Sequence, residues 1–281
     1  MSAVAPGTSA EGRADSVSRP ERRRRGCGID RRQFLALAPL GVLLAGCTTT
    51  PSPQRTAPGS ARAPRALVYR GPAACRGCSE AVAALLRTSP AKFDVAYCGP
   101  DEELPLTAAT LKPAAVYAQP GGGEVDPAWE IMRPHAKDIR DYVHAGGCYL
   151  GFCLGAYLAG SEPGYQLFPG DTDQYIRQED ATVRTSKDTI IAVDWRGKRR
   201  HLYFQDGPTF RLQPESEVTV LARYADTQYP AAIVTDSGQG RVGLVGPHPE
   251  ADHSWYSEHQ LHNPDGIRFD LGYDLITAAC A

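Results

Sequence analysis

A cysteine between two glycines is the first candidate for chemistry in this chain. Within GFCLGAYLAG, residues 151–160, Cys153 follows an apolar run and precedes small residues typical of a helix. Flanking glycines permit the strained strand-to-helix turn that presents a nucleophile, and a helix N-terminus favours the thiolate. The N–H of Leu154 would point into the same space as an oxyanion donor. The pattern also suits a small core residue beside tightly packed glycines, so it leaves both interpretations open.

A histidine and a glutamate near the end of the chain could complete the chemistry. The segment VGPHPE places His248 two residues before Glu250. A thiol nucleophile needs a base and a group that orients this base. Residues i and i+2 of an extended segment point the same way, so Glu250 can hold the far nitrogen of the His248 imidazole. A loop histidine followed by a solvated glutamate is the alternative, but the motif ends an apolar strand, which favours catalysis.

The third motif is the glycine-rich QPGGG, residues 119–123, which also ends an apolar run. Backbone N–H groups of Gly121 and Gly122 could join that of Leu154 in an oxyanion hole. A wide turn into the next helix is the structural alternative. Ligands of open parallel sheets bind outside the carboxyl ends of the strands. All three motifs follow predicted strands, so we expect them to meet at that edge.

A C-x-x-C motif, Cys75 to Cys78, opens the first predicted helix. It suits a thiol–disulfide redox role, a local structural disulfide or a pair of free thiols near the site, and we favour the last two. We expect Cys98, Cys148 and Cys280 to be small buried hydrophobes. His253, His259 and His262 lie close together in the sequence, but we expect surface residues there. No spacing typical of a metal site stands out, and we predict neither a metal nor a cofactor.

The segment from residue 66 onward predicts alternating strands and helices in one α/β domain. Such an alternation favours a parallel sheet with helices on both faces. The middle, from about residue 165 to 229, alternates apolar and polar residues and predicts antiparallel strands on one side of the sheet. A hairpin over 230–246 turning at 237–240 and a final helix follow. The remaining predicted strands are 65–71, 92–98, 113–123 and 148–152, and the helices are 79–87, 126–147 interrupted at Pro134, and 154–160.

The first 46 residues predict an export signal. DRRQFLALAPLGVLLAGC pairs Arg31 and Arg32 with an apolar stretch over 34–44, which is shorter than the roughly 20 residues of a membrane-spanning helix. The arginine pair resembles a twin-arginine signal, and Leu-Ala-Gly-Cys resembles a lipobox, which would place a lipid on Cys47. A basic disordered tail with a short core helix is the alternative. We therefore predict a signal peptide (1–46), a flexible tether (47–65) rich in Thr, Ser and Pro, and the folded domain (66–281).

Charge is unevenly placed along the chain. The whole sequence has 30 basic and 32 acidic residues, and residues 1–46 take eight arginines against four acids, leaving 22 basic and 28 acidic groups. A net charge of −6 outside the signal disfavours a nucleic-acid ligand, since phosphate binding needs a basic surface. The expected partners are a small-molecule or peptide amide and, through the lipid, a membrane. The expected location is extracytoplasmic, on a bacterial cell membrane.

These motifs, in this order, resemble the class I glutamine amidotransferase superfamily with its Cys-His-Glu triad. The segments LVYRGPAA, GGCYLGFCLGAYLAG, LFPG, YFQDGP, LARYAD and VGPHPE resemble more narrowly the amidotransferase-like domain at the N-terminus of biotin-protein ligases, which also occurs as a stand-alone bacterial protein. The resemblance covers nearly all of residues 66–256. It implies a flavodoxin-like sheet with Cys153 as nucleophile, His248 as base and Glu250 as orienting group.

The resemblance has limits that shape the expected function. We find no glycine-arginine-rich loop of the kind that holds biotinyl-adenylate, since WRGKRR (195–200) is a poor match, so biotin ligation is not implied. Leu154 stands where relatives often have a small residue, and FQDG leaves the roles of Gln205 and Asp206 open. The sequence therefore predicts an exported, lipid-anchored cysteine hydrolase that acts on an amide. The alternatives are a catalytically silent binding module of the cell envelope and a redox protein that uses Cys75 and Cys78.

Overall fold

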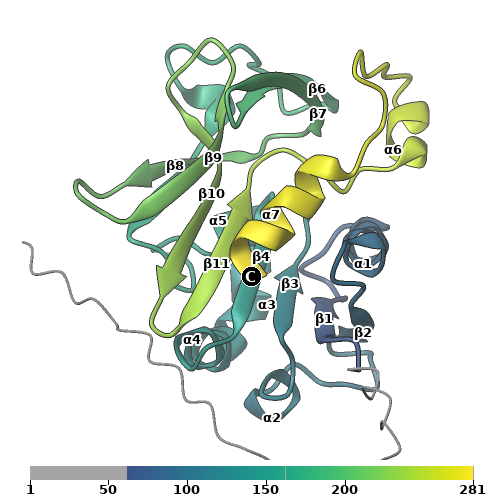
Figure 1. Cartoon of the computed structure of the whole chain (residues 1–281), viewed down its shortest axis with the longest axis vertical. Coiled ribbons are helices and arrows are strands. Elements are labelled where there is room, and N and C mark those ends of the chain that lie inside the picture. Colours follow the sequence, from purple (N-terminus) through teal and green to yellow (C-terminus); the bar gives the residue numbers. More distant parts are fainter. Residues whose placement is uncertain (1–61, 162, 281) are drawn as a thin grey trace, which may run out of the picture. The chain divides into compact units, whose positions relative to one another are not determined.

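A nine-stranded mixed sheet forms the centre of the protein. The computed structural model describes residues 62–161 and 163–280, so the predicted signal peptide, Cys47 and most of the tether lie outside the described residues. The strand order is β2-β1-β3-β4-β11-β10-β9-β6-β7 (Figure 1). Its strands are β1 (Arg65–Tyr69), β2 (Asp94–Cys98), β3 (Val116–Gln119), β4 (Cys148–Phe152), β6 (Thr189–Trp195), β7 (Lys198–Phe204), β9 (Val218–Tyr224), β10 (Pro230–Ser237) and β11 (Gly240–Val245).

The sheet divides into a parallel and an antiparallel half. Strands β2, β1, β3, β4 and β11 pair in parallel, whereas β10, β9, β6 and β7 pair with their neighbours antiparallel. A further pair, β5 (Gly170–Gln174) and β8 (Pro208–Leu212), forms a separate antiparallel two-stranded sheet. The predicted α/β fold with an antiparallel extension is therefore confirmed. The separate β5–β8 sheet was not expected.

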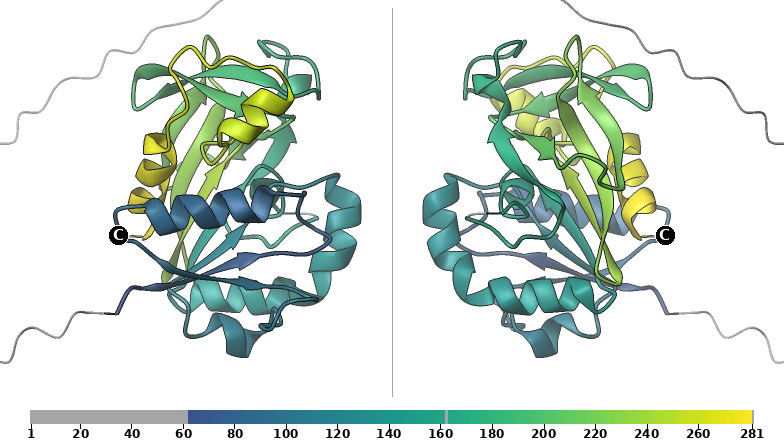
Figure 2. Two further views of the ribbon diagram at one scale, coloured as in Figure 1. Left: turned by 90° about the vertical axis from the view of Figure 1, so that its right-hand side faces the viewer. Right: turned by 90° about the vertical axis from the view of Figure 1, so that its left-hand side faces the viewer.

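Helices cover both faces of the parallel half, as the two side views of Figure 2 show. In β1, Ala66 and Val68 pack in the cluster that includes α1 and α7, while Leu67 and Tyr69 pack on the opposite face with residues of α2, α3, α4 and α5. This alternation follows from the two-residue period of a strand. The helices are α1 (Cys78–Thr88), α2 (Ala108–Leu111), α3 (Val125–Met132), α4 (Ala136–His144), α5 (Leu154–Tyr157), α6 (His253–Glu258) and α7 (Asp270–Cys280).

The helices confirm one predicted interruption and differ from the sequence prediction elsewhere. The helix predicted over 126–147 is interrupted at Pro134 as expected: a 3₁₀ turn at Arg133–His135 separates α3 from α4, because Pro134 has no N–H to continue the hydrogen-bond ladder. Helix α5 ends at Tyr157, three residues earlier than expected. Helix α6 was not predicted, and its first turn is capped by the side chain of Asp252. In the described part of the chain, no helix is both long and apolar enough to span a membrane.

One disulfide corrects the expectation for two cysteines. Cys148 opens β4 and Cys280 ends α7, and the two are joined by a disulfide across 132 residues, with a Cα–Cα distance of 5.8 Å. The prediction that both are merely small buried hydrophobes was therefore wrong. The pairing depends on α7 lying against β4 and β11, which no local spacing reveals. Cys98 is buried and free, as expected, and burial raises the pKa of its thiol to about 12.

Candidate active site

The three sequence motifs meet at the carboxyl ends of three adjacent parallel strands. Strand β4 pairs with β3 on one side, Gln119 opposite Gly151, and with β11 on the other, Val245 opposite Phe152. The N–H of Cys153 continues this ladder and donates to the Val245 carbonyl at 2.9 Å. Because each motif directly follows its strand, the sheet register itself sets their distances.

Cys153 adopts a backbone conformation that L-residues rarely hold. Its dihedral angles are φ 47° and ψ −102°, and it precedes the first residue of α5. Non-glycine residues in this region carry a strain of roughly 1–3 kcal/mol and are found mainly where surrounding packing enforces them. The thiol is almost buried, with 7% of the residue exposed, and its sulfur lies 3.6 Å from the carbonyl oxygen of Gln205. This is the strained strand-to-helix turn that the glycine spacing predicts.

The flanking glycines are required by close backbone packing. A Cβ on Gly151 would lie 2.5 Å from the Gly155 carbonyl oxygen, and one on Gly155 would overlap the Gln119 carbonyl. The N–H of Gly155 donates to the Pro120 carbonyl at 3.2 Å. The turn that carries Cys153 is therefore held directly against the glycine-rich loop after β3.

His248 and Glu250 form a buried pair. Nδ1 of His248 lies 2.8 Å from Oε1 of Glu250, with 4% and 0% of the residues exposed. The other carboxylate oxygen of Glu250 has no hydrogen-bond partner within the described residues. His248 is therefore the sole hydrogen-bond partner of the Glu250 carboxylate in that part of the chain. The N–H of His248 donates to the Tyr203 carbonyl at 2.9 Å, which fixes the loop after β11. The i, i+2 arrangement expected from the sequence is present.

The electrostatics of this pair favour a charged imidazole. Burial lowers the pKa of His248, but attraction to Glu250 and to Cys153 outweighs it and raises the pKa to about 10. A protonated imidazole beside the sulfur stabilises a thiolate. The arrangement therefore places a positively charged imidazole beside the candidate nucleophile at neutral pH.

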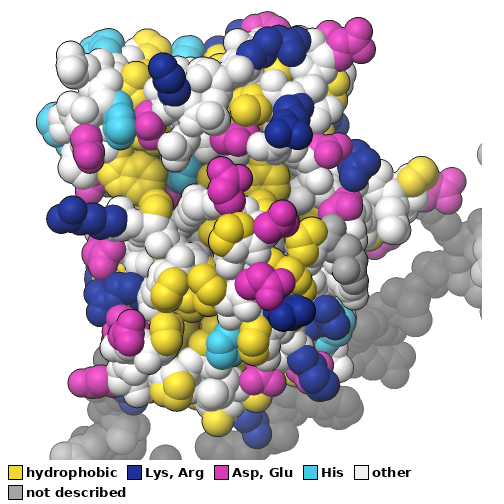
Figure 3. Space-filling model, turned by 180° about the vertical axis from the view of Figure 1, so that it is seen from behind, with side chains coloured by type: hydrophobic (Ala, Val, Ile, Leu, Met, Phe, Trp, Pro, Cys, Tyr) yellow, Lys and Arg dark blue, Asp and Glu magenta, His cyan; other side chains and the backbone are white. Residues whose placement is uncertain are grey.

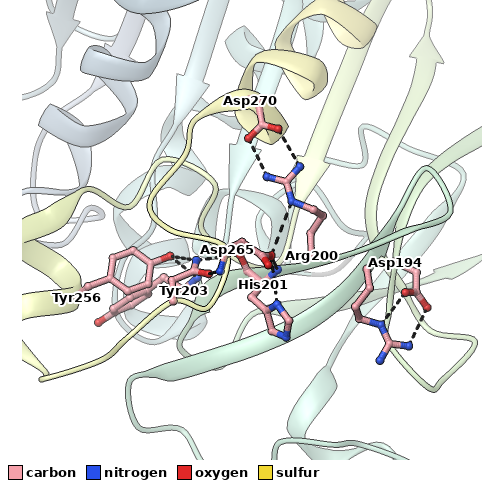
Figure 4. A network of polar contacts seen from close by, with 9 residues as sticks. Asp194, Arg200, His201, Tyr203, Tyr256, Asp265 and Asp270 are labelled. Carbon is pink, nitrogen blue, oxygen red and sulfur yellow. Dashed lines mark hydrogen bonds and ion pairs between the residues drawn. The ribbon is translucent and has the colours of Figure 1, made fainter.

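Aromatic residues and a polar network support His248 from outside. The Tyr203 and Trp255 rings lie 5.9 Å and 5.1 Å from the imidazole. Figure 4 shows the network that ties β7 to α6 and to the first residue of α7: the Tyr203 N–H donates to the Tyr256 hydroxyl, and Arg200 makes two hydrogen bonds with Asp270 at 2.8 and 2.9 Å. This network joins β7, which carries Tyr203, to α6, which carries Trp255.

Backbone donors are available where an oxyanion would form. Among the backbone hydrogen bonds of the described residues, the N–H groups of Gly121, Gly122 and Leu154 have no acceptor. Gly121 lies against both partners of the pair, because a Cβ there would be 3.0 Å from His248 Cε1 and 3.7 Å from Cys153 Cβ. A Cβ on Gly122 would overlap the side chain of Leu154. The structure thus brings the predicted donors together, with Leu154 narrowing the space above Gly122.

Cys153 opens into a cavity of about 1030 Å³. Residues of β5, of the connection between β7 and β8, and of β8 line part of this cavity, so segments outside the parallel half of the sheet contribute to the site. Its charge is predominantly acidic, since five acids and two arginines line it, and Arg211 is paired with Asp171 and Asp173. The charged lining residues are Glu124, Asp126, Asp171, Asp173, Asp206, Arg177 and Arg211.

Gln205 and Asp206, whose roles the sequence leaves open, both line the cavity. The Gln205 carbonyl faces the sulfur of Cys153, and Asp206 has a positive φ of 48°. Asp206 accepts a hydrogen bond from Gln174 Nε2 at 2.8 Å, and its carbonyl accepts one from the Tyr157 hydroxyl at 3.1 Å. Burial raises the pKa of the Asp206 carboxyl, opposed by the Gln174 bond and reinforced by Glu124. The unusual FQDG segment is the signal that points to them.

The C-x-x-C motif lies beside the site as a disulfide. Cys75 and Cys78 are bonded, so the predicted local disulfide is present. The Cys75 N–H donates to the Gly121 carbonyl at 3.0 Å, which joins this loop to the glycine-rich turn. Within the described ranges, no group of three or more potential metal ligands is found. His253, His259 and His262 are exposed, as expected.

The arginine-rich segment 195–200 lies in the β6–β7 hairpin, away from the cavity. Its arginines are engaged by carboxylates: Arg196 with Asp274 at 2.7 Å, and Arg199 with Asp194 and Asp226 at 2.8 and 2.9 Å. On the face shown in Figure 3, basic and acidic side chains are intermixed. The segment therefore has a structural use and does not form a free phosphate-binding loop.

Comparison with known proteins identifies relatives over most of the domain. A family model described as the N-terminal region of biotin-protein ligase matches residues 65–178 and 174–268. The biotin–protein ligase of Schizosaccharomyces pombe is 28% identical over 174 residues, which are 53% of this chain and 27% of the ligase. An uncharacterised protein of Chlamydia muridarum is 33% identical over 157 residues, 47% of this chain and 58% of that protein. The match thus spans a minor part of the ligase.

Among solved structures, an exo-β-1,4-mannosidase from an Opitutaceae bacterium covers 77% of this chain and 36% of its own, at 16% identity and a TM-score of 0.48. A ThuA-like protein from Bacteroides uniformis covers 78% of this chain and 91% of its own, at 12% identity and a TM-score of 0.45. Likeness at this level carries no argument about function.

Proposed function

The chain belongs to the biotin-protein ligase N-terminal family, and from this premise we propose that its domain is a cysteine hydrolase that cleaves an amide bond. The observation that carries the proposal is the convergence of a strained Cys153 with the buried His248–Glu250 pair at the mouth of a cavity. Strained backbone of this kind clusters at active sites, where the surrounding structure enforces it. The amidotransferase-like character of the domain supports the same chemistry.

The proposed reaction has two steps. The Cys153 thiolate attacks the amide carbonyl carbon, and the N–H groups of Gly122 and Leu154 stabilise the oxyanion. Protonated His248 then gives its proton to the leaving amine as the carbon–nitrogen bond breaks, which leaves a thioester on Cys153. In the second step, His248 takes a proton from water, and the hydroxide formed attacks the thioester carbonyl carbon. The carbon–sulfur bond breaks, its electron pair returns to Cys153 as the thiolate, and the carboxylic acid product leaves and loses its proton to solvent. Glu250 stabilises the imidazolium throughout.

The charge of the cavity supports a neutral or cationic amide as substrate. Three more acids than arginines line it, so an anionic substrate would be repelled. We do not extend the proposal to biotin ligation, because the chain matches 27% of the ligase and its arginine-rich hairpin is engaged in ion pairs.

The second-order rate of alkylation of Cys153 by iodoacetamide, measured from pH 4 to 9 in the variant Cys75→Ser/Cys78→Ser, which has no neighbouring disulfide, tests the proposal. An activated thiolate reacts well below the pKa of about 8.5 of a free thiol. The Cys98→Ser variant, which removes the buried free thiol, must leave this rate unchanged. If Cys153 reacts no faster than free cysteine at neutral pH, the domain is a binding module that keeps the fold without turnover.

We further propose that the domain is exported by the twin-arginine route and anchored through a lipid on Cys47. The route carries folded proteins, which is compatible with a free thiol on Cys153. Metabolic labelling with an alkyne fatty acid tests the anchor, since the wild-type chain is expected to be labelled and its Cys47→Ser variant is not. Labelling that persists in that variant would remove the proposal without affecting the hydrolase.

A further inference from the structure

Two cysteines lie beside one glycine at the proposed site. A Cβ on Gly121 would lie 3.6 Å from Cys78 Sγ and 3.7 Å from Cys153 Cβ. The disulfide partner of Cys78 is Cys75. Residue 121 is a glycine, so it places no side chain between Cys78 and Cys153. We infer that Cys153 and the Cys75–Cys78 disulfide form one thiol–disulfide exchange site.

The two halves of the disulfide differ in a way that sets the direction of exchange. Cys78 is buried at 1% exposure and lies on the side of Gly121 and Cys153, whereas Cys75 is exposed to solvent. A thiolate leaves more readily where water stabilises its charge. Cys153 should therefore attack Cys78, and Cys75 should leave.

The loop that carries the disulfide is fixed to the site. The Cys75 N–H donates to the Gly121 carbonyl at 3.0 Å, and Gln119 Nε2 donates to the Ala73 carbonyl at 3.2 Å. The Gln119 amide is itself held by the Tyr117 hydroxyl at 2.6 Å. The disulfide thus stays close to the nucleophile in the folded protein.

The exchange balances without any outside oxidant. The Cys153 thiolate forms a bond to the sulfur of Cys78, the Cys75–Cys78 bond breaks, and its electron pair remains on Cys75 as a thiolate that takes a proton from solvent. The chain holds one disulfide and one thiol in this group before and after. Exchange caps the nucleophile, so the inference rests on the proposed hydrolase and adds a redox control of it. A dithiol reductant that reduces the Cys78–Cys153 bond, and is itself oxidised to a disulfide, releases the Cys153 thiol.

Trapping the leaving thiol tests the exchange. The full chain carrying Cys27→Ser and Cys47→Ser, isolated without reductant, is treated with N-ethylmaleimide at neutral pH, denatured, digested and mapped by mass spectrometry. We expect maleimide on Cys75 together with a Cys78–Cys153 linkage, and loss of both in the additional variant Cys153→Ser. Chains with Cys75–Cys78 intact and maleimide only on Cys153, or with no Cys78–Cys153 linkage, would overturn the inference.

Two matched controls keep the result specific. The Cys148–Cys280 disulfide lies at the other end of β4 and should stay intact in every sample, which shows that scrambling has not occurred. The variant Cys98→Ser should give the same linkage as its parent. A linkage that involves Cys98, Cys148 or Cys280 would mean that unfolded chains exchange at random, and this too would contradict the inference.

A third variant separates this inference from the proposed function. The double variant Cys75→Ser/Cys78→Ser cannot exchange, so its alkylation by iodoacetamide reports the nucleophile alone. Fast alkylation there, without a Cys78–Cys153 linkage in the parent chain, removes the exchange and leaves the hydrolase. Slow alkylation there, with the linkage present, removes the hydrolase and leaves the exchange. Treatment of the parent with dithiothreitol is expected to raise its alkylation rate to that of the double variant.

Discussion

The two ends of strand β4 make opposite use of cysteine. At its amino end, Cys148 is bonded to Cys280 and ties α7 to the sheet. At its carboxyl end, the strand runs into Cys153, which is free, nearly buried and held at a positive φ. One end gains stability from a covalent link across 132 residues, and the other stores backbone strain beside a buried charge. The difference teaches that one short strand can anchor a fold and carry its chemistry.

Removing the sulfur at the carboxyl end should have the largest effect. We expect Cys153→Ser to lower amide hydrolysis by roughly a thousandfold or more, because the serine hydroxyl is a poor nucleophile in a site that favours a thiolate. Its melting temperature should stay close to that of the wild type. Cys98→Ser, which changes the other free cysteine, is expected to keep its activity. Equal losses in the two variants would show that the assay reports folding and not catalysis.

Neutralising the orienting carboxylate comes next. Glu250→Gln should lower kcat on the order of 100-fold, because it removes the charge that stabilises the imidazolium. The matched control is Asp252→Asn, which changes an exposed carboxylate two residues further on. Steady-state kinetics on both variants check the prediction. A Glu250→Gln enzyme with unchanged kcat would exclude Glu250 from the proposed triad.

The buried His248–Glu250 pair predicts that the stability of the protein depends on pH. The pKa of His248 is about 10 in the folded protein against 6.5 for the free side chain. A raised pKa means that the folded state binds the proton more tightly, so this contribution is complete below pH 6.5 and is lost as the pH rises toward 10. Urea unfolding from pH 6 to 10 should show a fall in the free energy of unfolding that Glu250→Gln makes shallower. Parallel curves for the two proteins would contradict the prediction.

The amino end of β4 should respond in stability alone. We expect Cys148→Ser/Cys280→Ser to lower the free energy of unfolding by about 2–4 kcal/mol, because the unfolded chain regains the freedom of a long loop. Alkylation of Cys153 by iodoacetamide should proceed at the wild-type rate in the folded variant. A changed rate would mean that the two ends of the strand are coupled, which would weaken the contrast between them.

The smallest expected effect concerns the charge of the cavity wall. Asp206→Asn should slow the reaction of Cys153 with a cationic methanethiosulfonate by roughly two- to fivefold and leave the neutral methyl reagent unaffected, since a partly exposed carboxylate contributes modestly. Asp101→Asn, an exposed carboxylate that does not line the cavity, is the control. Equal slowing with both reagents would point to a steric change at Asp206.

Local pattern was enough to predict which residues meet at the candidate site. Glycines around Cys153 and the i, i+2 spacing of His248 and Glu250 describe geometry over a few residues, and parallel strand ends necessarily gather at one edge. The fold class followed from the alternation of strands and helices. The catalytic roles themselves stay predictions that the kinetic experiments address.

Contacts between segments that are far apart in the sequence could not be predicted from local pattern. The Cys148–Cys280 bond requires α7 to reach the start of β4, and the approach of Gln205 to Cys153 requires the antiparallel extension to fold back over the site. Helix α6 was missed because it has only six residues, too few for a periodic pattern. Tertiary packing, and not propensity, places these segments.

The backbone at residue 153 has a consequence for engineering this protein. Glycine reaches φ 47° without a clashing Cβ, so Cys153→Gly should yield a chain that resists heating better than the natural one while losing its reactive sulfur. Any screen that selects only for thermal robustness would thus tend to discard the nucleophile, and a functional readout has to accompany it.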